Sequence, residues 1–162
     1  MSRGLIHEAG HAVIGLHFGF DIDGIEMKDR FLSVMITDLD SPERTQQERY
    51  IFLTGGIASE SLSFGNYDVG AVGDDQKKIN VRGGGPVEDY VVDALEILRT
   101  NKVRLDQIKN ELCLKGITAP LEAGYNDDPD SYVLLSRQEL YRIWAGCQGP
   151  KIQTGSTRLS ET

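Results

Sequence analysis

The sequence predicts a mainly helical protein with a small β element, an α+β fold. Apolar residues recur at helical spacing through most of the chain, most clearly over 87–115. Residues 22–36 instead read as two short strands, and turn and capping residues separate the segments. A chain of 162 residues is long enough for one domain with a real core. We expect a single domain over residues 1–149 and a disordered tail over 150–162.

The first predicted helix runs from about Gly4 to Phe18, with Gly19 as its stop. It contains His7-Glu8-Ala9-Gly10-His11, which matches H-E-x-x-H, a pattern found in many zinc metalloproteases. Residues i and i+4 share one helix face, so both imidazoles can reach a single metal ion. Glu8 would sit beside that metal and could accept a proton from a bound water. The other side chains of this helix are mostly small or apolar, so the helix is expected to be buried. A bound zinc ion would explain why a buried helix carries two histidines and a glutamate.

The next segments alternate between strand, helix and loop. The residues around Ile25 and those of 31–36 form a predicted hairpin. Ser41-Pro42 supplies an N-cap and a first helical position, and we expect a helix from there to about Leu62. A glycine-rich loop over 64–73 follows, and Asp74-Asp75 opens a short helix that runs to about Val81.

The last third of the chain carries the strongest helical pattern. The residues from Gly83 to Pro86 interrupt the helical pattern. A long helix is then predicted from Val87 to Lys115, and Gly116 ends it. Residues 121–130 are acidic and rich in turn formers. Ser136 and Glu139 then form a capping box for a final short helix through Trp144.

A catalytic zinc normally has three protein ligands, and three residues are candidates for the third. His17 lies ten residues after His7, but Ile14 occupies the position where the chain would have to turn. In a continuous helix His17 lies about 280° around from His7 and points away from it. Glu60 is the one charged residue in a stretch of small and apolar residues over 55–62. It could be a metal ligand, a group that supports a ligand, or a residue that faces solvent. Asp74 follows a glycine-rich segment, whose backbone could come close to the helix that carries His7 and His11. It could equally be a plain N-cap.

Composition limits the other classes of function. The net charge of −8 argues against nucleic-acid binding. Two cysteines are too few for a disulfide framework and fit a reducing compartment, so we expect a cytoplasmic protein. No apolar run approaches the roughly 20 residues that a membrane span requires, and no signal peptide is visible.

Three segments resemble the peptidase domain of the FtsH family, the ATP-dependent zinc proteases of bacteria and organelles. Residues 7–13 reproduce its H-E-A-G-H-A-hydrophobic signature, and residues 55–65 are similar to its G-G-R-A-A-E-E-hydrophobic-x-F-G segment. Residues 70–74 resemble G-A-S-N-D, whose Asp is the third zinc ligand in that family. With weaker similarity along the long helix and the final short one, the resemblance covers roughly Leu5 to Trp144.

The resemblance implies a helical zincin fold with a small β-hairpin element. It also implies that His7, His11 and Asp74 bind Zn²⁺ and that Glu8 is the general base. Glu60 aligns with the first Glu of the A-E-E segment, and we interpret it as the acceptor for the N–H of a zinc-bound histidine. Asp75, next to Asp74, is an open alternative for the third ligand.

The sequence departs from the family in several places. It contains no G-x-x-x-x-G-K-[ST] loop, so we expect no ATPase motor of its own. Ile57, Ser61 and Gly73 replace the Arg, the second Glu and the Asn of the family segments. We therefore expect a zinc-dependent metalloendopeptidase that acts on flexible peptides or unfolded proteins. The resemblance also allows an ATPase partner in trans and a homo-oligomer. The alternative is a proteolytically inactive zinc-binding or regulatory module.

Overall fold

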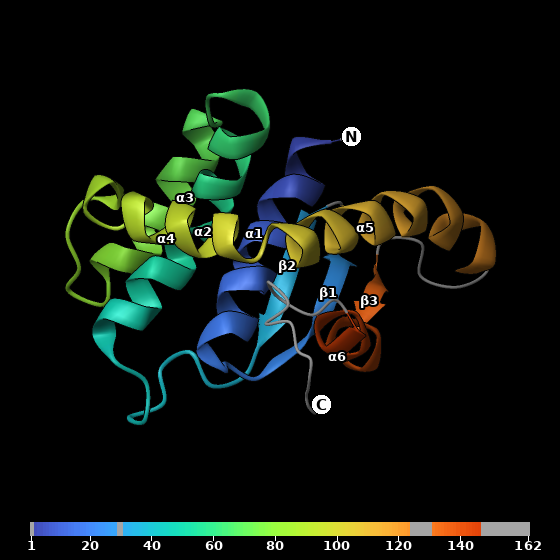
Figure 1. The fold of residues 1–162 in the computed structure, drawn as a ribbon, viewed down its shortest axis with the longest axis horizontal. Coiled ribbons are helices and arrows are strands. Elements are labelled where there is room, and N and C mark those ends of the chain that lie inside the picture. Colours follow the sequence, from blue (N-terminus) through green and yellow to red (C-terminus); the bar gives the residue numbers. More distant parts are fainter. Residues whose placement is uncertain (1, 29–30, 124–130, 147–162) are drawn as a thin grey trace, which may run out of the picture.

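The computed structural model describes residues 2–28, 31–123 and 131–146 (Figure 1). Its elements are α1 (Arg3–Phe18), β1 (Ile22–Lys28), β2 (Phe31–Ile36), α2 (Gln46–Phe64), α3 (Val69–Asn80), a 3₁₀ turn η1 (Val87–Asp89), α4 (Val91–Thr100), α5 (Lys102–Ala123), β3 (Ser131–Ser136) and α6 (Arg137–Gly146). The expected mainly helical α+β architecture is confirmed. None of the described helices is long and apolar enough to cross a membrane. The tail expected over 150–162 lies outside the described residues.

Helix α1 lies at the centre of the molecule (Figure 1), and ten of its residues are buried. The Ser2 side chain accepts the N–H of Leu5 at 3.3 Å and caps its start. Gly19 adopts a φ of 76° and ends the helix as predicted. Every residue from Ile6 to Leu16 except Glu8 is buried, because α2, α5 and the sheet all pack against this helix.

The contact between α1 and α2 is close enough to require glycine on both helices. A Cβ atom on Gly10 would lie 2.2 Å from the carbonyl oxygen of Gly55. One turn away, the Ser59 hydroxyl donates to the carbonyl of Ile6 at 2.7 Å. The Thr54-Gly55-Gly56 stretch therefore serves close packing inside a continuous helix.

The sheet has three strands in the order β2-β1-β3, and both pairings are antiparallel (Figure 1). The predicted β1–β2 hairpin is confirmed, with Ile25 opposite Val34. Strand β3 was not predicted, and it adds to the other side of β1 with Leu135 opposite Ile25. Strand β2 thus forms the sheet edge next to α1.

Two predicted helix starts are wrong. Helix α2 begins at Gln46 rather than at Ser41-Pro42, because Thr45 and Glu48 form a complete capping box there. Helix α3 begins at Val69 rather than at Asp74, because the Asp68 side chain accepts the N–H of Gly70 at 3.1 Å. The second half of the glycine-rich stretch predicted as a loop, residues 69–73, is therefore helical.

The long helix predicted from Val87 to Lys115 is two helices, α4 and α5. They meet at Asn101, whose side-chain amide donates to the carbonyl of Ile97 at 2.9 Å and so caps the end of α4. Helix α5 continues past Gly116 to Ala123, so the predicted stop at Gly116 is also wrong. The capping box of Ser136 and Glu139 at the start of α6 is confirmed, with hydrogen bonds of 3.0 and 3.1 Å.

We expect Gly10→Ala to lower the free energy of unfolding by about 3 kcal/mol or more, because a backbone carbonyl blocks the new methyl group. Denaturant unfolding followed by circular dichroism measures this. Gly73→Ala is the matched control, since a Cβ atom there would meet no described atom within 4 Å and the residue sits inside α3. It should raise stability by about 0.5–1 kcal/mol. Equal effects of the two substitutions would contradict the close contact between α1 and α2.

Candidate metal centre

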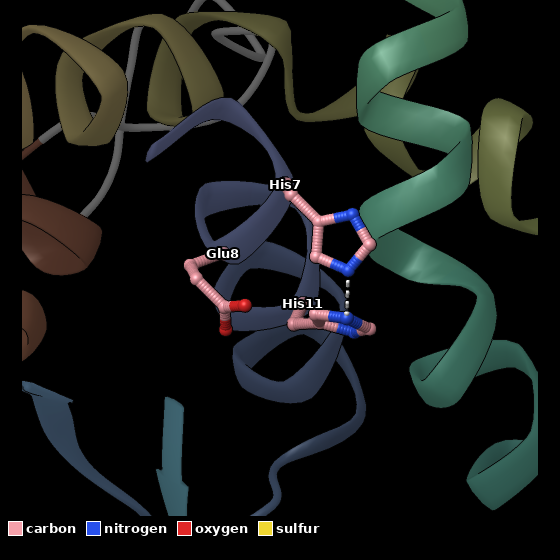
Figure 2. Close-up of side chains that lie close together, drawn as sticks. All are labelled: His7, Glu8 and His11. Atoms are coloured by element: carbon pink, nitrogen blue, oxygen red, sulfur yellow. Dashed lines mark hydrogen bonds between the residues drawn. The ribbon is translucent and has the colours of Figure 1, made fainter. Parts of the chain in front are cut away.

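His7 and His11 lie one turn apart on α1 and turn their rings toward each other (Figure 2). Their Nε2 atoms are 3.0 Å apart, and only 8% and 6% of the two residues is exposed. The ring centroids are 4.7 Å apart with planes at 70°, an edge-to-face arrangement. The i, i+4 spacing thus brings both imidazoles to one buried point, as the sequence predicted.

The other ring nitrogen of each histidine contacts an oxygen acceptor. His7 Nδ1 lies 2.6 Å from Glu60 Oε2, and His11 Nδ1 lies 2.8 Å from the carbonyl oxygen of Phe52. A carbonyl only accepts, and the Glu60 carboxylate already accepts two other hydrogen bonds, so each Nδ1 carries the proton. In the neutral rings, both Nε2 atoms are therefore bare lone pairs that face each other.

The carboxylate that meets these two atoms is that of Asp75, on α3. Its Oδ2 lies 3.1 Å from His7 Nε2 and 3.5 Å from His11 Nε2. Asp75 is only 3% exposed, and among the described residues this oxygen has no hydrogen-bond partner. Asp74, which the sequence analysis favoured, is exposed instead. One residue corresponds to a rotation of about 100° around a helix, so Asp74 and Asp75 cannot face the same point.

Three buried acceptor atoms therefore converge on one point. Such an arrangement is costly unless a cation or a shared proton lies between them. Burial lowers the pKa of His7, but Asp75, Glu8 and Glu60 outweigh it and raise that pKa to about 9. Burial raises the pKa of Asp75, but His11 and His7 outweigh it and hold that pKa well below its usual range. The site thus favours positive charge, and its two nitrogens and one oxygen are a donor set that suits a divalent metal.

Glu8 lies beside this point rather than between the histidines (Figure 2). One ligand atom from each of His7, Glu8 and His11 falls within 4.8 Å of the others. The Oε2 atom of Glu8 accepts the backbone N–H of Val34 at 3.1 Å, on the edge strand β2. This hydrogen bond positions the carboxylate and satisfies an N–H at the edge of the described sheet.

The Glu60 carboxylate, on α2, is hydrogen-bonded both to α1 and to the segment before α3. Its Oε2 contacts His7, while its Oε1 accepts from Arg3 Nη1 at 3.1 Å and from the N–H of Asp68 at 3.0 Å. Arg3 also lies over the Phe64 ring, 4.3 Å from its centroid. Since Asp68 is the cap of α3, the same carboxylate that orients His7 also anchors the helix that carries Asp75.

Gly56 gives the His7 ring its space. A Cβ atom there would lie 2.2 Å from His7 Nε2 and 2.4 Å from two of the ring carbons. The roles of Arg3 and Gly56 were missed by the sequence analysis. His17, the weakest ligand candidate, is exposed at the end of α1, where its Nδ1 lies 3.3 Å from the side-chain amide of Asn101. It is therefore not part of the site.

Two cavities adjoin the site. The larger, of about 480 Å³, is lined by His7, Glu8, Asp74 and Asp75 among others, and we refer to it as the acidic cavity. The smaller, of about 240 Å³, is lined by Glu8, His11 and Asp75 and by apolar residues of β2 and α2. We refer to it as the apolar cavity. Glu8 lines both cavities.

No family model and no curated protein matches the chain. The function of the site is therefore argued from its geometry and chemistry.

In the metal-free protein, we expect the free energy of unfolding to fall between pH 6.5 and 9. The pKa of His7 is raised in the folded state, so its stabilising effect is complete below 6.5 and is lost as the pH rises through 9. A shift of this size corresponds to about 3 kcal/mol. Denaturant unfolding across this pH range in the presence of a chelator measures it. Asp75→Asn should remove most of the decrease, and an unchanged pH profile in that variant would contradict the role of Asp75.

Proposed function

We propose that this protein is a zinc-dependent metalloendopeptidase that cleaves flexible peptides or unfolded proteins. The convergence of three buried acceptors, His7 Nε2, His11 Nε2 and Asp75 Oδ2, is the observation that carries the proposal. Two imidazole nitrogens and one carboxylate are a common ligand set of catalytic zinc, which keeps its fourth position for water or substrate. The FtsH-like fold is part of the proposal, with Asp75 in place of Asp74 as the third ligand.

The chain's own residues supply the proton transfers of peptide hydrolysis. When bound, zinc would polarise the scissile carbonyl and make a water molecule more acidic. Glu8 is held through Oε2 by the N–H of Val34, so its Oε1 can accept the proton of the attacking water. Glu8 would then transfer that proton to the leaving amine nitrogen as the C–N bond breaks.

The supporting residues keep the ligands in the required form. The Glu60 carboxylate and the Phe52 carbonyl hold the protons of His7 and His11 on Nδ1, so that both Nε2 atoms remain available to a metal. The sequence contains no ATPase motif, which is why we propose flexible segments as substrates. An ATPase partner in trans, a homo-oligomeric ring and a cytoplasmic location belong to the same proposal.

We expect the purified protein to contain about one zinc ion per chain and Asp75→Ala to lose most of it. Asp75 is a ligand in the proposal, and its removal leaves two imidazoles alone. Elemental analysis after dialysis measures this. Asp74→Ala is the matched control and should retain zinc, because its side chain is exposed. Loss of zinc in Asp74→Ala with retention in Asp75→Ala would reverse the assignment.

We expect Glu8→Gln to keep the fold and the zinc but to lower cleavage of unfolded casein by about 100-fold or more. The amide can still accept the N–H of Val34 but cannot take a proton from water. The measurement is the initial rate of casein cleavage with added zinc, with a chelator as the negative control. Undiminished cleavage by the variant would rule out this mechanism. Zinc binding without any cleavage by the wild type would favour the inactive zinc-binding module instead.

A further inference from the structure

The acidic and the apolar cavity meet at the reaction centre. Both are lined by Glu8, Leu32, Asp75 and Lys78. Beyond these shared residues the two linings differ in chemistry. Since adjacent side chains of an extended peptide point to opposite faces, two neighbouring residues of a substrate need two separate sites. The two cavities therefore offer separate sites for the residues on either side of a scissile bond.

The acidic cavity keeps negative charge after its internal pairs are counted. Glu60 is paired with Arg3 and His7, and Asp75 faces the histidines. Asp68, Asp74 and Lys78 remain on the wall and all three are exposed, so carboxylates outnumber the single ammonium group there. Asp68 uses one oxygen to cap α3, whereas Asp74 makes no ion pair within the described part of the chain. Two solvent-facing carboxylates on the wall of a large cavity favour a cationic side chain over an anionic one.

The apolar cavity has the opposite character. Its additional lining is mostly aliphatic and aromatic, from Val34, Ile36, Leu39, Phe52 and Leu53. The charge of Arg82 at this cavity is already neutralised, because Asp40 accepts from its Nε at 2.7 Å and from its Nη2 at 2.9 Å. A cavity of about 240 Å³ with such walls suits one uncharged side chain of moderate size.

We propose that the enzyme selects peptide bonds between a basic residue, which enters the acidic cavity, and a leucine or phenylalanine, which enters the apolar cavity. This substrate class rests on the proposed function and assigns Asp74 a role in specificity. Because Asp74 is exposed, its charge acts on the substrate and not on the fold. The preference is electrostatic on one side and hydrophobic on the other, so the two sides respond differently to salt.

Quenched fluorescent peptides test the proposal. Each peptide carries Lys, Gln or Glu next to Leu, in both orders, within an otherwise identical neutral sequence. We expect the wild type with zinc to cleave the better Lys peptide with a kcat/KM about tenfold above that of its Glu counterpart, and the Gln peptide to fall between them. Raising the salt concentration to about 0.5 M should reduce this ratio. Replacing Leu by Asp should reduce cleavage at any salt concentration.

Asp74→Lys should bring the ratio of Lys to Glu peptide to one or below. Glu96→Lys is the matched control, because it reverses an exposed charge on α4 that lines neither cavity. It should leave the ratio unchanged. Cleavage of all peptides at equal rates, or the same ratio in Asp74→Lys as in the wild type, would overturn this proposal and leave the peptidase function intact. Absence of cleavage of every peptide and of casein by the zinc-loaded protein would overturn both.

Discussion

The hydrogen bond between His7 Nδ1 and the Glu60 carboxylate is the interaction on which the candidate site depends. It spans α1 and α2 at 2.6 Å and fixes the ring that meets both His11 and Asp75. The same carboxylate reaches the start of α3 through the N–H of Asp68. One buried side chain thus sets the relative positions of three helices. A buried carboxylate is costly unless it is fully paired, and Glu60, 1% exposed, has three donors.

Close helix packing makes this hydrogen bond geometrically possible. Gly10 and Gly55 let the backbones of α1 and α2 approach, and Gly56 leaves the volume that the His7 ring occupies. Larger residues at these positions would separate the helices or displace the ring. Small residues on α1 and α2 therefore serve the core and the candidate site together, and His7 and His11 lie on the stretch of α1 from Ile6 to Leu16 that is buried except at Glu8.

Much of the site could be predicted from the sequence, because His7, Glu8 and His11 are close in the chain and their geometry follows from a single helix. Asp75 could not be predicted in the same way, because its orientation depends on where α3 begins. If Asp74 is taken as the cap, the helix starts several residues later than it does. The sequence pattern then gives no sign that Asp75 lies on a buried face. From the true cap at Asp68, Asp75 and Ile79 fall one turn apart on one buried face.

The elements that were missed have similar explanations. The apolar pattern of α4 and α5 stays in phase across Asn101, so periodicity alone does not reveal the break. Strand β3 is short, and its partner is remote in sequence. Thr45 and Glu48 compete with Ser41-Pro42 as a helix start, and the reciprocal hydrogen bonds of a capping box are a stronger signal than a single cap with proline.

The pairing of β3 with β1 joins two segments that are far apart in the sequence, and this affects how the sheet folds. Gly24 pairs with Ser136, so completing the sheet requires closure of a loop that contains α2 to α5, whereas β1 and β2 pair locally. Loop-closure entropy makes such a long-range pairing a slow step. Until it forms, β1 has an unpaired edge beside the apolar side chains of Ile22 and Ile25. A chain that stopped after α5 would keep every residue of the candidate metal centre and yet be prone to join another copy edge to edge.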